Sequence, residues 1–266
     1  MNQNTIEKAY CALELERKIV GMKFLHTEEE YAQEYAQETK AKMNYCVLVR
    51  MAMNGSGRKV KLEDFGCMSA ARAFGMVEPD ERWLSGMCYR EKGMYRDLST
   101  ARKVVRNTSC STQNARAIVV KPLEEYIETT PDVVLIVTHP YNIMRLIQGY
   151  TYQFGTYKEF KLIGNQAFCS ECTAYPLESN EINISTLCSG TRYIANWKHE
   201  EMAMGIPFGK FETVIEGLYR TIDVMVPQKE KEKIKEKLKE KRRTDLELNF
   251  KMHEENKFKG PLYIIK

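Results

Sequence analysis

Four cysteines recur in a similar setting in the two halves of the chain and could act together as ligands. Cys46 and Cys67 are separated by 20 residues in the first half, and Cys169 and Cys188 by 18 residues in the second. Four thiolates complete a tetrahedral zinc site or hold an iron–sulfur cluster. We therefore predict that the protein binds zinc or an iron–sulfur cluster, with a redox or accessory role, through cysteines from both halves.

Other uses of these cysteines stay open at this stage. The spacings are wide, so the fold would have to assemble the site. Cys169 and Cys172 form a CxxC pair that could supply two ligands or act as a dithiol. Cysteine is also common in protein cores. Thiol catalysis would need a neighbouring base, and His139, which follows a strongly apolar segment, is the best candidate among the histidines.

Two arginines suggest an alternative function. Arg72 and Arg192 each follow the second cysteine of a pair by four or five residues. A guanidinium group can bind a carboxylate or phosphate through two hydrogen bonds, and Ser189 and Gly190 could add donors at the start of a helix. The alternative is a small anionic ligand held at the interface of the two halves by these residues and His139. Each arginine could equally pair with a structural carboxylate.

Hydrophobic periodicity predicts alternating strands and helices. The run at residues 131–140 is rich in Val and Ile, which favours a central strand buried on both faces. Residues 46–53 fit a buried strand or a buried helix. Other strands are expected at residues 20–25, 59–62, 117–123 and 182–187. Helices are expected at residues 2–18, 28–42, 67–74, 94–105 and 141–154, and one introduced by residues 204–209 should continue through Leu218.

The order of these elements is similar in the two halves. Each half has a strand, a helix, a cysteine-bearing segment, a strand into the second cysteine, a turn of small residues with an arginine, and a further helix. We therefore predict an α/β fold of two similar halves from an internal duplication, at residues 1–116 and 117–226. A charged helical appendage follows at residues 227–266.

The charge of the chain is concentrated in this appendage. Residues 229–243 hold nine basic and four acidic side chains, which is a local charge of +5. Because the whole chain has a net charge of +4, the remainder sums to −1. The body therefore lacks the basic surface typical of nucleic-acid binding. Ile234 and Leu238 stand four residues apart and predict a narrow apolar stripe on a solvated helix. This stripe, or the apolar residues after 245, could dock on the body, on a protein partner or on a second copy.

The composition predicts a cytoplasmic protein without a membrane partner. No run of roughly 18 apolar residues is present, as a transmembrane helix would require. The first residues lack the pattern of a signal peptide. Reducing compartments keep thiols reduced, so the eight cysteines do not predict a disulfide framework.

Several sequence blocks occur in the order found in one known family. They are Val20-Gly21-Met22-Lys23-Phe24, Asp64-Phe65-Gly66-Cys67, Pro131-Asp132-Val133-Val134-Leu135-Ile136-Val137, Ala167-Phe168-Cys169-Ser170-Glu171, Leu187-Cys188-Ser189-Gly190-Thr191-Arg192 and Met204-Gly205-Ile206-Pro207-Phe208. On these blocks the chain resembles the domain-of-unknown-function-169 family of bacterial and archaeal proteins over residues 10–225. The resemblance implies a shared architecture and assigns no reaction.

Overall fold

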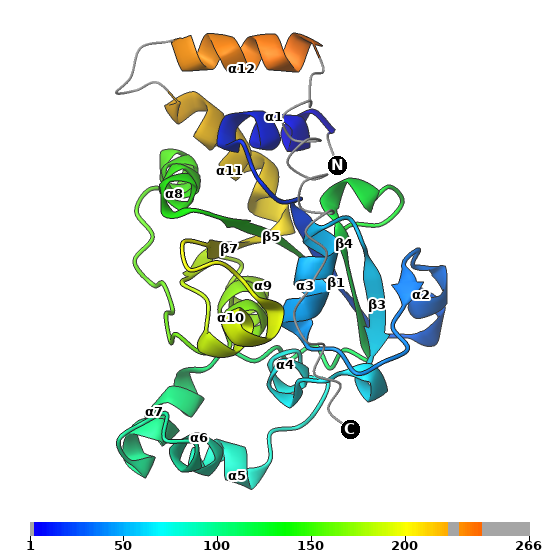
Figure 1. Ribbon diagram of the computed structural model, residues 1–266, viewed down its shortest axis with the longest axis vertical. Coiled ribbons are helices and arrows are strands. Elements are labelled where there is room, and N and C mark those ends of the chain that lie inside the picture. Colours follow the sequence, from blue (N-terminus) through cyan, green and yellow to red (C-terminus); the bar gives the residue numbers. More distant parts are fainter. Residues whose placement is uncertain (1–2, 223–228, 241–266) are drawn as a thin grey trace.

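The fold is built on one seven-stranded sheet with helices packed on both faces (Figure 1). The computed structural model describes residues 3–222 and 229–240. The strand order is β2-β3-β4-β1-β5-β7-β6, and among these strands only β2 and β3 pair in parallel. The mixed α/β class is confirmed. The strands are β1 (Val20–Leu25), β2 (Gln37–Glu38), β3 (Arg58–Lys61), β4 (Ala117–Pro122), β5 (Val133–Thr138), β6 (Asn183–Ser185) and β7 (Met202–Pro207).

Strand β5 lies near the centre of the sheet, and its six residues are all buried. The prediction of a central strand covered on both faces is confirmed. Val133, Leu135 and Val137 join the hydrophobic cluster on one face, whereas Val134 and Ile136 join the cluster on the other. Alternate residues of a strand point to opposite faces, so a continuous apolar run is required even though the neighbours are antiparallel.

The two helical layers differ in composition. One face carries α3 (Tyr45–Met53), α4 (Met68–Ala73), the π-helix η3 (Ala167–Ala174), α9 (Tyr175–Ser179) and α10 (Ser189–Ala195). The opposite face carries α1 (Gln3–Leu13), α8 (Pro140–Phe154) and α11 (Phe208–Thr221). Residues 45–53 are therefore a helix, which settles the choice that periodicity left open. Short 3-10 turns follow β3 at Leu62–Asp64 and β4 at Leu123–Glu125.

The pairing register has an approximate twofold symmetry. At the centre, β1 and β5 pair so that Val20 lies opposite Leu135 and Met22 opposite Val133. On the outer sides, Val20 lies opposite Pro122 of β4, and Val133 lies opposite Pro207 of β7. Strand β3 then follows β4, and β6 follows β7. Strand β4, which the sequence analysis placed at the start of the second half, thus lies between two strands of the first half.

Several helices have other bounds than the sequence predicted, and α1 ends at Leu13 and not at residue 18. Helix α2 (Glu28–Gln33) opens with a capping box between Thr27 and Glu30 and ends at Gln33, because the chain then enters β2. The prediction of a helix to residue 42 was wrong. A further short helix, α5 (Glu81–Leu84), was not predicted. With α6 (Met87–Glu91) and α7 (Leu98–Asn107), this helix forms an excursion at the bottom of Figure 1 around its own small apolar cluster.

The charged appendage contains α12 (Lys229–Glu240), at the top of Figure 1. Its predicted apolar stripe is confirmed and is used within the chain: Ile234 is buried against Cys11 and Ile222, and Leu238 packs beside it. Docking by the residues after 245 lies outside the described part of the chain. None of the helices described is both long and apolar enough to cross a bilayer.

The contact of β7 with the π-helix depends on Gly205. A Cβ atom at this position would lie 1.9 Å from the carbonyl oxygen of Cys172. We predict that Gly205→Ala lowers the free energy of unfolding by about 3 kcal/mol, because the backbone of one element must move. Gly209→Ala is the matched control, since an added Cβ there meets no atom within 4 Å. Urea unfolding of both variants tests this, and equal stabilities would contradict it.

Candidate cysteine site

The four cysteines of the predicted site lie on the same face of the sheet. Cys46 is in the first turn of α3, and Cys169 is in the π-helix. Cys67 and Cys188 are the N-cap residues of α4 and α10. All four belong to one hydrophobic cluster or pack directly against it. The structure thus brings cysteines from both halves, and from four separate elements, to one place.

The pKa shifts of the thiols reflect this proximity. Burial first, and then the charges of Cys67 and Cys188, raise the pKa of the Cys46 thiol to about 12. Burial also raises the pKa of Cys169 well above the ordinary value, with added repulsion from Cys67, Cys188 and Cys46. The charged forms repel one another because they stand within electrostatic range in a poorly hydrated setting. Without a bound cation, Cys46 and Cys169 are therefore neutral thiols at neutral pH.

The four cysteines do not form a ready-made metal site among the described residues. Within residues 3–222 and 229–240, no group of three or more His, Cys, Asp or Glu side chains is arranged to hold a metal ion. The four thiols gather in one region without converging on one point. Cys169 and Cys188 are each 8% exposed, whereas Cys46 and Cys67 are half-buried, so the region is reached from the surface.

The π-helix is the most unusual element of the site. π-Helices are rare and are often found at functional sites, and here all eight residues are buried. Glu171 fixes the helix from inside: its carboxylate accepts hydrogen bonds from Ile163 N (2.6 Å), Gly164 N (2.9 Å) and the Ser185 hydroxyl. Burial raises the pKa of Glu171, and these hydrogen bonds oppose the shift.

Backbone strain occurs immediately before Cys188. Leu187 has a φ of +65°, in the left-handed region that bulky residues avoid. Such a conformation costs on the order of 1–3 kcal/mol and is commonly found at functional sites. The Leu187 N–H donates to Ser185 Oγ at 3.1 Å, which helps to hold the turn. The strained turn directs Cys188 into the first turn of α10, where Thr191 N donates to its Sγ at 3.3 Å.

Cys172, the second member of the CxxC pair, has a different environment. Its side chain is fully buried, and its pKa is raised by burial and next by the charge of Glu171. The neighbouring Tyr45 hydroxyl is hydrogen-bonded to the Thr173 hydroxyl at 2.9 Å, which links α3 to the π-helix inside the core. Cys172 therefore belongs to the packing between the π-helix and β7.

Arg72 and Arg192 are engaged in contacts within the protein. Arg192 donates to the carbonyl oxygens of Thr186 (2.7 Å), Glu201 (3.0 Å) and Lys198, and so holds the loop after α10. Arg72 forms an ion pair with Asp80 at 3.3 Å and lies 5.9 Å from the ring centre of Trp83. Ser189 and Gly190 are exposed at the start of α10. A Cβ atom on Gly190 would have Cys188 Sγ, at 3.9 Å, as its neighbour.

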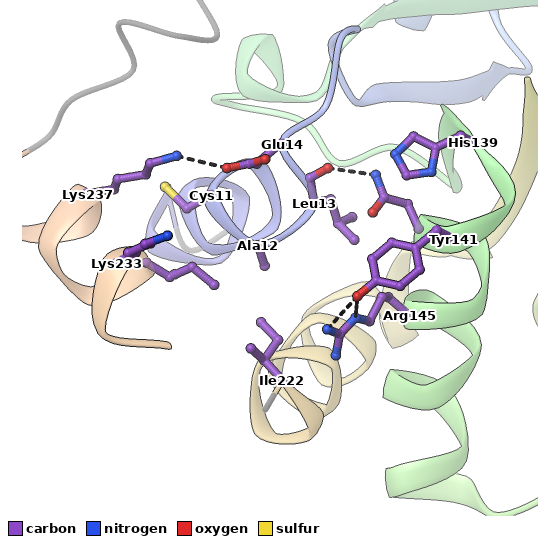
Figure 2. Close-up of a pocket in the computed structure, with 12 residues that line it drawn as sticks. Cys11, Ala12, Leu13, Glu14, His139, Tyr141, Arg145, Ile222, Lys233 and Lys237 are labelled. Atoms are coloured by element: carbon purple, nitrogen blue, oxygen red, sulfur yellow. Dashed lines mark hydrogen bonds and ion pairs between the residues drawn. The ribbon is translucent and has the colours of Figure 1, made fainter. Parts of the chain in front are cut away.

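His139 lies on the opposite face of the sheet from the cysteines. It is the N-cap of α8, stacks on Tyr141 with ring centres 6.2 Å apart, and lines a pocket between α1, α8, α11 and α12 (Figure 2). A residue that follows a buried strand is favoured as a site residue where the strands run parallel, because sites lie at the carboxyl ends of parallel strands. Strand β5, which precedes it, is antiparallel to both of its neighbours. The structure does not bring His139 together with the four cysteines.

The excursion contributes residues that sequence reasoning missed. Tyr89 of α6 accepts a hydrogen bond from the side chain of Gln166, which precedes the π-helix with a φ of +53°. Burial raises the pKa of Tyr89, and the charge of Cys169 raises it further. Ser170 donates to the carbonyl oxygen of Ser109 at 2.9 Å. The excursion therefore lies against the cysteine site, and no periodicity or motif could have indicated this.

The fold and the site define a mixed α/β protein that gathers four cysteines beneath one helical layer. The chain belongs to the domain-of-unknown-function-169 family, described as uncharacterised ArCR, whose model matches residues 9–217. An uncharacterized protein of Methanocaldococcus jannaschii is 25% identical over 206 residues, which cover 77% of this chain and 88% of the relative. No solved structure matches the chain. Helix α12 lies beyond the range that the family matches.

The raised thiol pKa values predict a pH-dependent stability of the metal-free protein. An ordinary thiol ionises near pH 8.5, whereas folded Cys46 keeps its proton up to about pH 12. Between these values the unfolded state binds fewer protons, so stability falls as the pH rises. We expect Cys46→Ser to make this fall shallower. Urea unfolding between about pH 7 and about pH 10 measures it, and identical slopes for the two proteins would contradict the assignment.

Proposed function

We propose that the protein binds an iron–sulfur cluster through Cys46, Cys67, Cys169 and Cys188, for a redox or accessory role. The supporting observation is that thiols from four elements lie in one region, where the charges of Cys67 and Cys188 add to the burial that raises the pKa of Cys46 and Cys169. A bound metal would remove the repulsion between the ionised thiols, because coordination deprotonates a thiol and the metal balances the charge of the thiolate. When bound, the cluster would supply electron transfer; the chain supplies the thiolates and a largely dry setting.

The arrangement favours a cluster over a single zinc ion. Zinc draws four sulfurs to one centre at about 2.3 Å each, and within the described residues no three ligands are so arranged. The cysteine ligands of a four-iron cluster bind different irons, so they stand further apart around a larger group. A four-iron cluster therefore requires less convergence of the four thiols than a zinc ion does.

The anionic-ligand alternative at Arg72 and Arg192 has less support. Arg192 already donates to three backbone carbonyls, and Arg72 is paired with Asp80. Recruiting either guanidinium group for a ligand would break these contacts. His139, the third member of that proposed set, lines a different pocket on the other face of the sheet.

We further infer that the two halves arose by duplication, as residues 20–122 and 133–207. The symmetric register of β1 and β5 with their outer neighbours supports this. Cys67 and Cys188 also occupy equivalent N-cap positions after β3 and β6. A duplication would explain why each half contributes two cysteines. All eight cysteines are free, which fits a reducing cytoplasmic compartment.

The cluster proposal is tested on protein purified without oxygen. We expect iron and acid-labile sulfide together with a broad visible absorbance. Serine at position 46, 67, 169 or 188 should remove most of the bound iron, because each substitution deletes a ligand. Cys88→Ser is the matched control, since Cys88 packs in the separate cluster of the excursion and should be neutral to iron content.

Three results would overturn the proposal. Protein that folds normally but contains neither iron nor sulfide after cluster reconstitution would assign the four cysteines to packing. Equal iron in the control and in all four ligand variants would place the metal elsewhere. Stoichiometric zinc with no colour would replace the cluster with a structural metal site.

A further inference from the structure

The excursion formed by α5, α6 and α7, at the bottom of Figure 1, is a basic region on an otherwise acidic body. Residues 87–107 hold six basic and two acidic side chains, which is a local charge of +4. Because the whole chain carries +4 and residues 229–243 carry +5, the rest of the chain sums to −5. The cysteine-site proposal makes no use of the outer surface of this excursion.

Most of the basic side chains of this region have no acidic partner. Its two carboxylates are already engaged, Glu91 with Arg82 and Asp97 with Arg96. The other five basic residues are all exposed: Arg90, Lys92, Arg102, Lys103 and Arg106. Among residues 3–222 and 229–240, none of these five forms an ion pair. Their charge is therefore available to a partner.

Three of these residues share the outer face of α7. Arg102, Lys103 and Arg106 fall within about 100° of the helix circumference, since successive residues of a helix are about 100° apart. Ala101 and Val105 are buried on the other side, in the small apolar cluster of the excursion. The packing that holds α7 in place therefore fixes the three charges on its outer face.

Exposed apolar side chains border this basic face. Leu84 at the end of α5 is 50% exposed, and Met87 at the start of α6 is 39% exposed. The turn between them lies against α7, because Arg102 Nε donates to Ser85 O at 3.4 Å and a Cβ atom on Gly86 would lie 2.7 Å from Arg102 N. Methionine and arginine are enriched in protein interfaces, whereas contacts to a nucleic acid backbone use polar and charged groups. The combination fits a protein partner with an acidic surface.

The inner side of the same excursion reaches the cysteine site. Tyr89 of α6 is buried, and its hydroxyl accepts a hydrogen bond from Gln166, which precedes the π-helix. The side chains of Tyr89 and Cys169 lie within electrostatic range of each other. Met87 and Arg90 belong to the same short helix and are exposed. A partner on the outer surface therefore lies across α6 from the cysteine site.

We propose that the surface of Leu84, Met87, Arg102, Lys103 and Arg106 docks a small acidic electron-carrier protein. The basic side chains meet carboxylates of the carrier, and the two apolar side chains contact its surface. The exchange of electrons rests on the proposed iron–sulfur cluster: the reduced carrier loses one electron, the cluster gains it, and no bond is made or broken. Helix α12 is also basic, but it lies at the opposite end of the molecule (Figure 1).

Calorimetric titration of the full chain with two acidic carriers, a plant-type ferredoxin and a flavodoxin, tests the docking surface. Binding of at least one carrier is expected at low ionic strength, and it should weaken as salt is added. The double variant Lys103→Glu/Arg106→Glu should bind that carrier at least about tenfold more weakly, because attractive charges become repulsive. The matched control Lys235→Glu/Lys239→Glu reverses two exposed charges on α12 and should change the affinity less than about twofold.

Iron content separates this inference from the cluster proposal. Cys46→Ser should lose its iron and no longer accept electrons from the carrier, yet bind the carrier as tightly as the unmodified protein does. Protein that contains no iron but still binds the carrier through α7 would remove the cluster proposal and support the docking surface.

Three outcomes would overturn the docking surface. One is that neither carrier binds the unmodified protein at submillimolar concentration. Another is equal weakening by the two double variants, which would show an effect of overall charge. The third is that Lys103→Glu/Arg106→Glu abolishes self-association or the binding of duplex DNA, which would assign the surface to a second copy or to a nucleic acid.

Discussion

The antiparallel pairing of β1 with β5 is the contact on which the rest of the structure depends. It joins the two halves into one sheet, with Val20 opposite Leu135 and Met22 opposite Val133. Because α4 and α10 then lie on the same face, the cysteines at their starts come to the same region. Residues about a hundred positions apart in the sequence are thereby brought into one hydrophobic cluster.

The cysteine site combines three features that stability alone does not require. Thiols that repel one another when ionised are placed together, the chain adopts a rare π-helix, and Leu187 is held at positive φ. Strain of this kind persists only where surrounding contacts determine the conformation. Glu171 and Ser185 supply such contacts from beneath the π-helix. The shared thiolate-bound cofactor that we propose would account for these features together.

Sequence periodicity predicted the elements that bury a continuous apolar run or one apolar stripe. The Val-rich run of β5 and the stripe of Ile234 and Leu238 behave as their patterns indicate. Strand β7 was missed because Met202–Pro207 lacks alternation and becomes a strand only by pairing with β5. The π-helix was missed because its shape depends on distant partners of Glu171. The four cysteines were identified from their repeated context, whereas the contacts of Gln166 and Tyr89 left no signal in the sequence.

The most direct measurement is anomalous diffraction at the iron absorption edge, on crystals grown without oxygen. The account predicts an anomalous peak among α3, α4, the π-helix and α10, within bonding distance of the sulfurs of Cys46, Cys67, Cys169 and Cys188. Four sulfurs packed against apolar neighbours, with no anomalous peak between them in protein reconstituted with iron and sulfide, would contradict it.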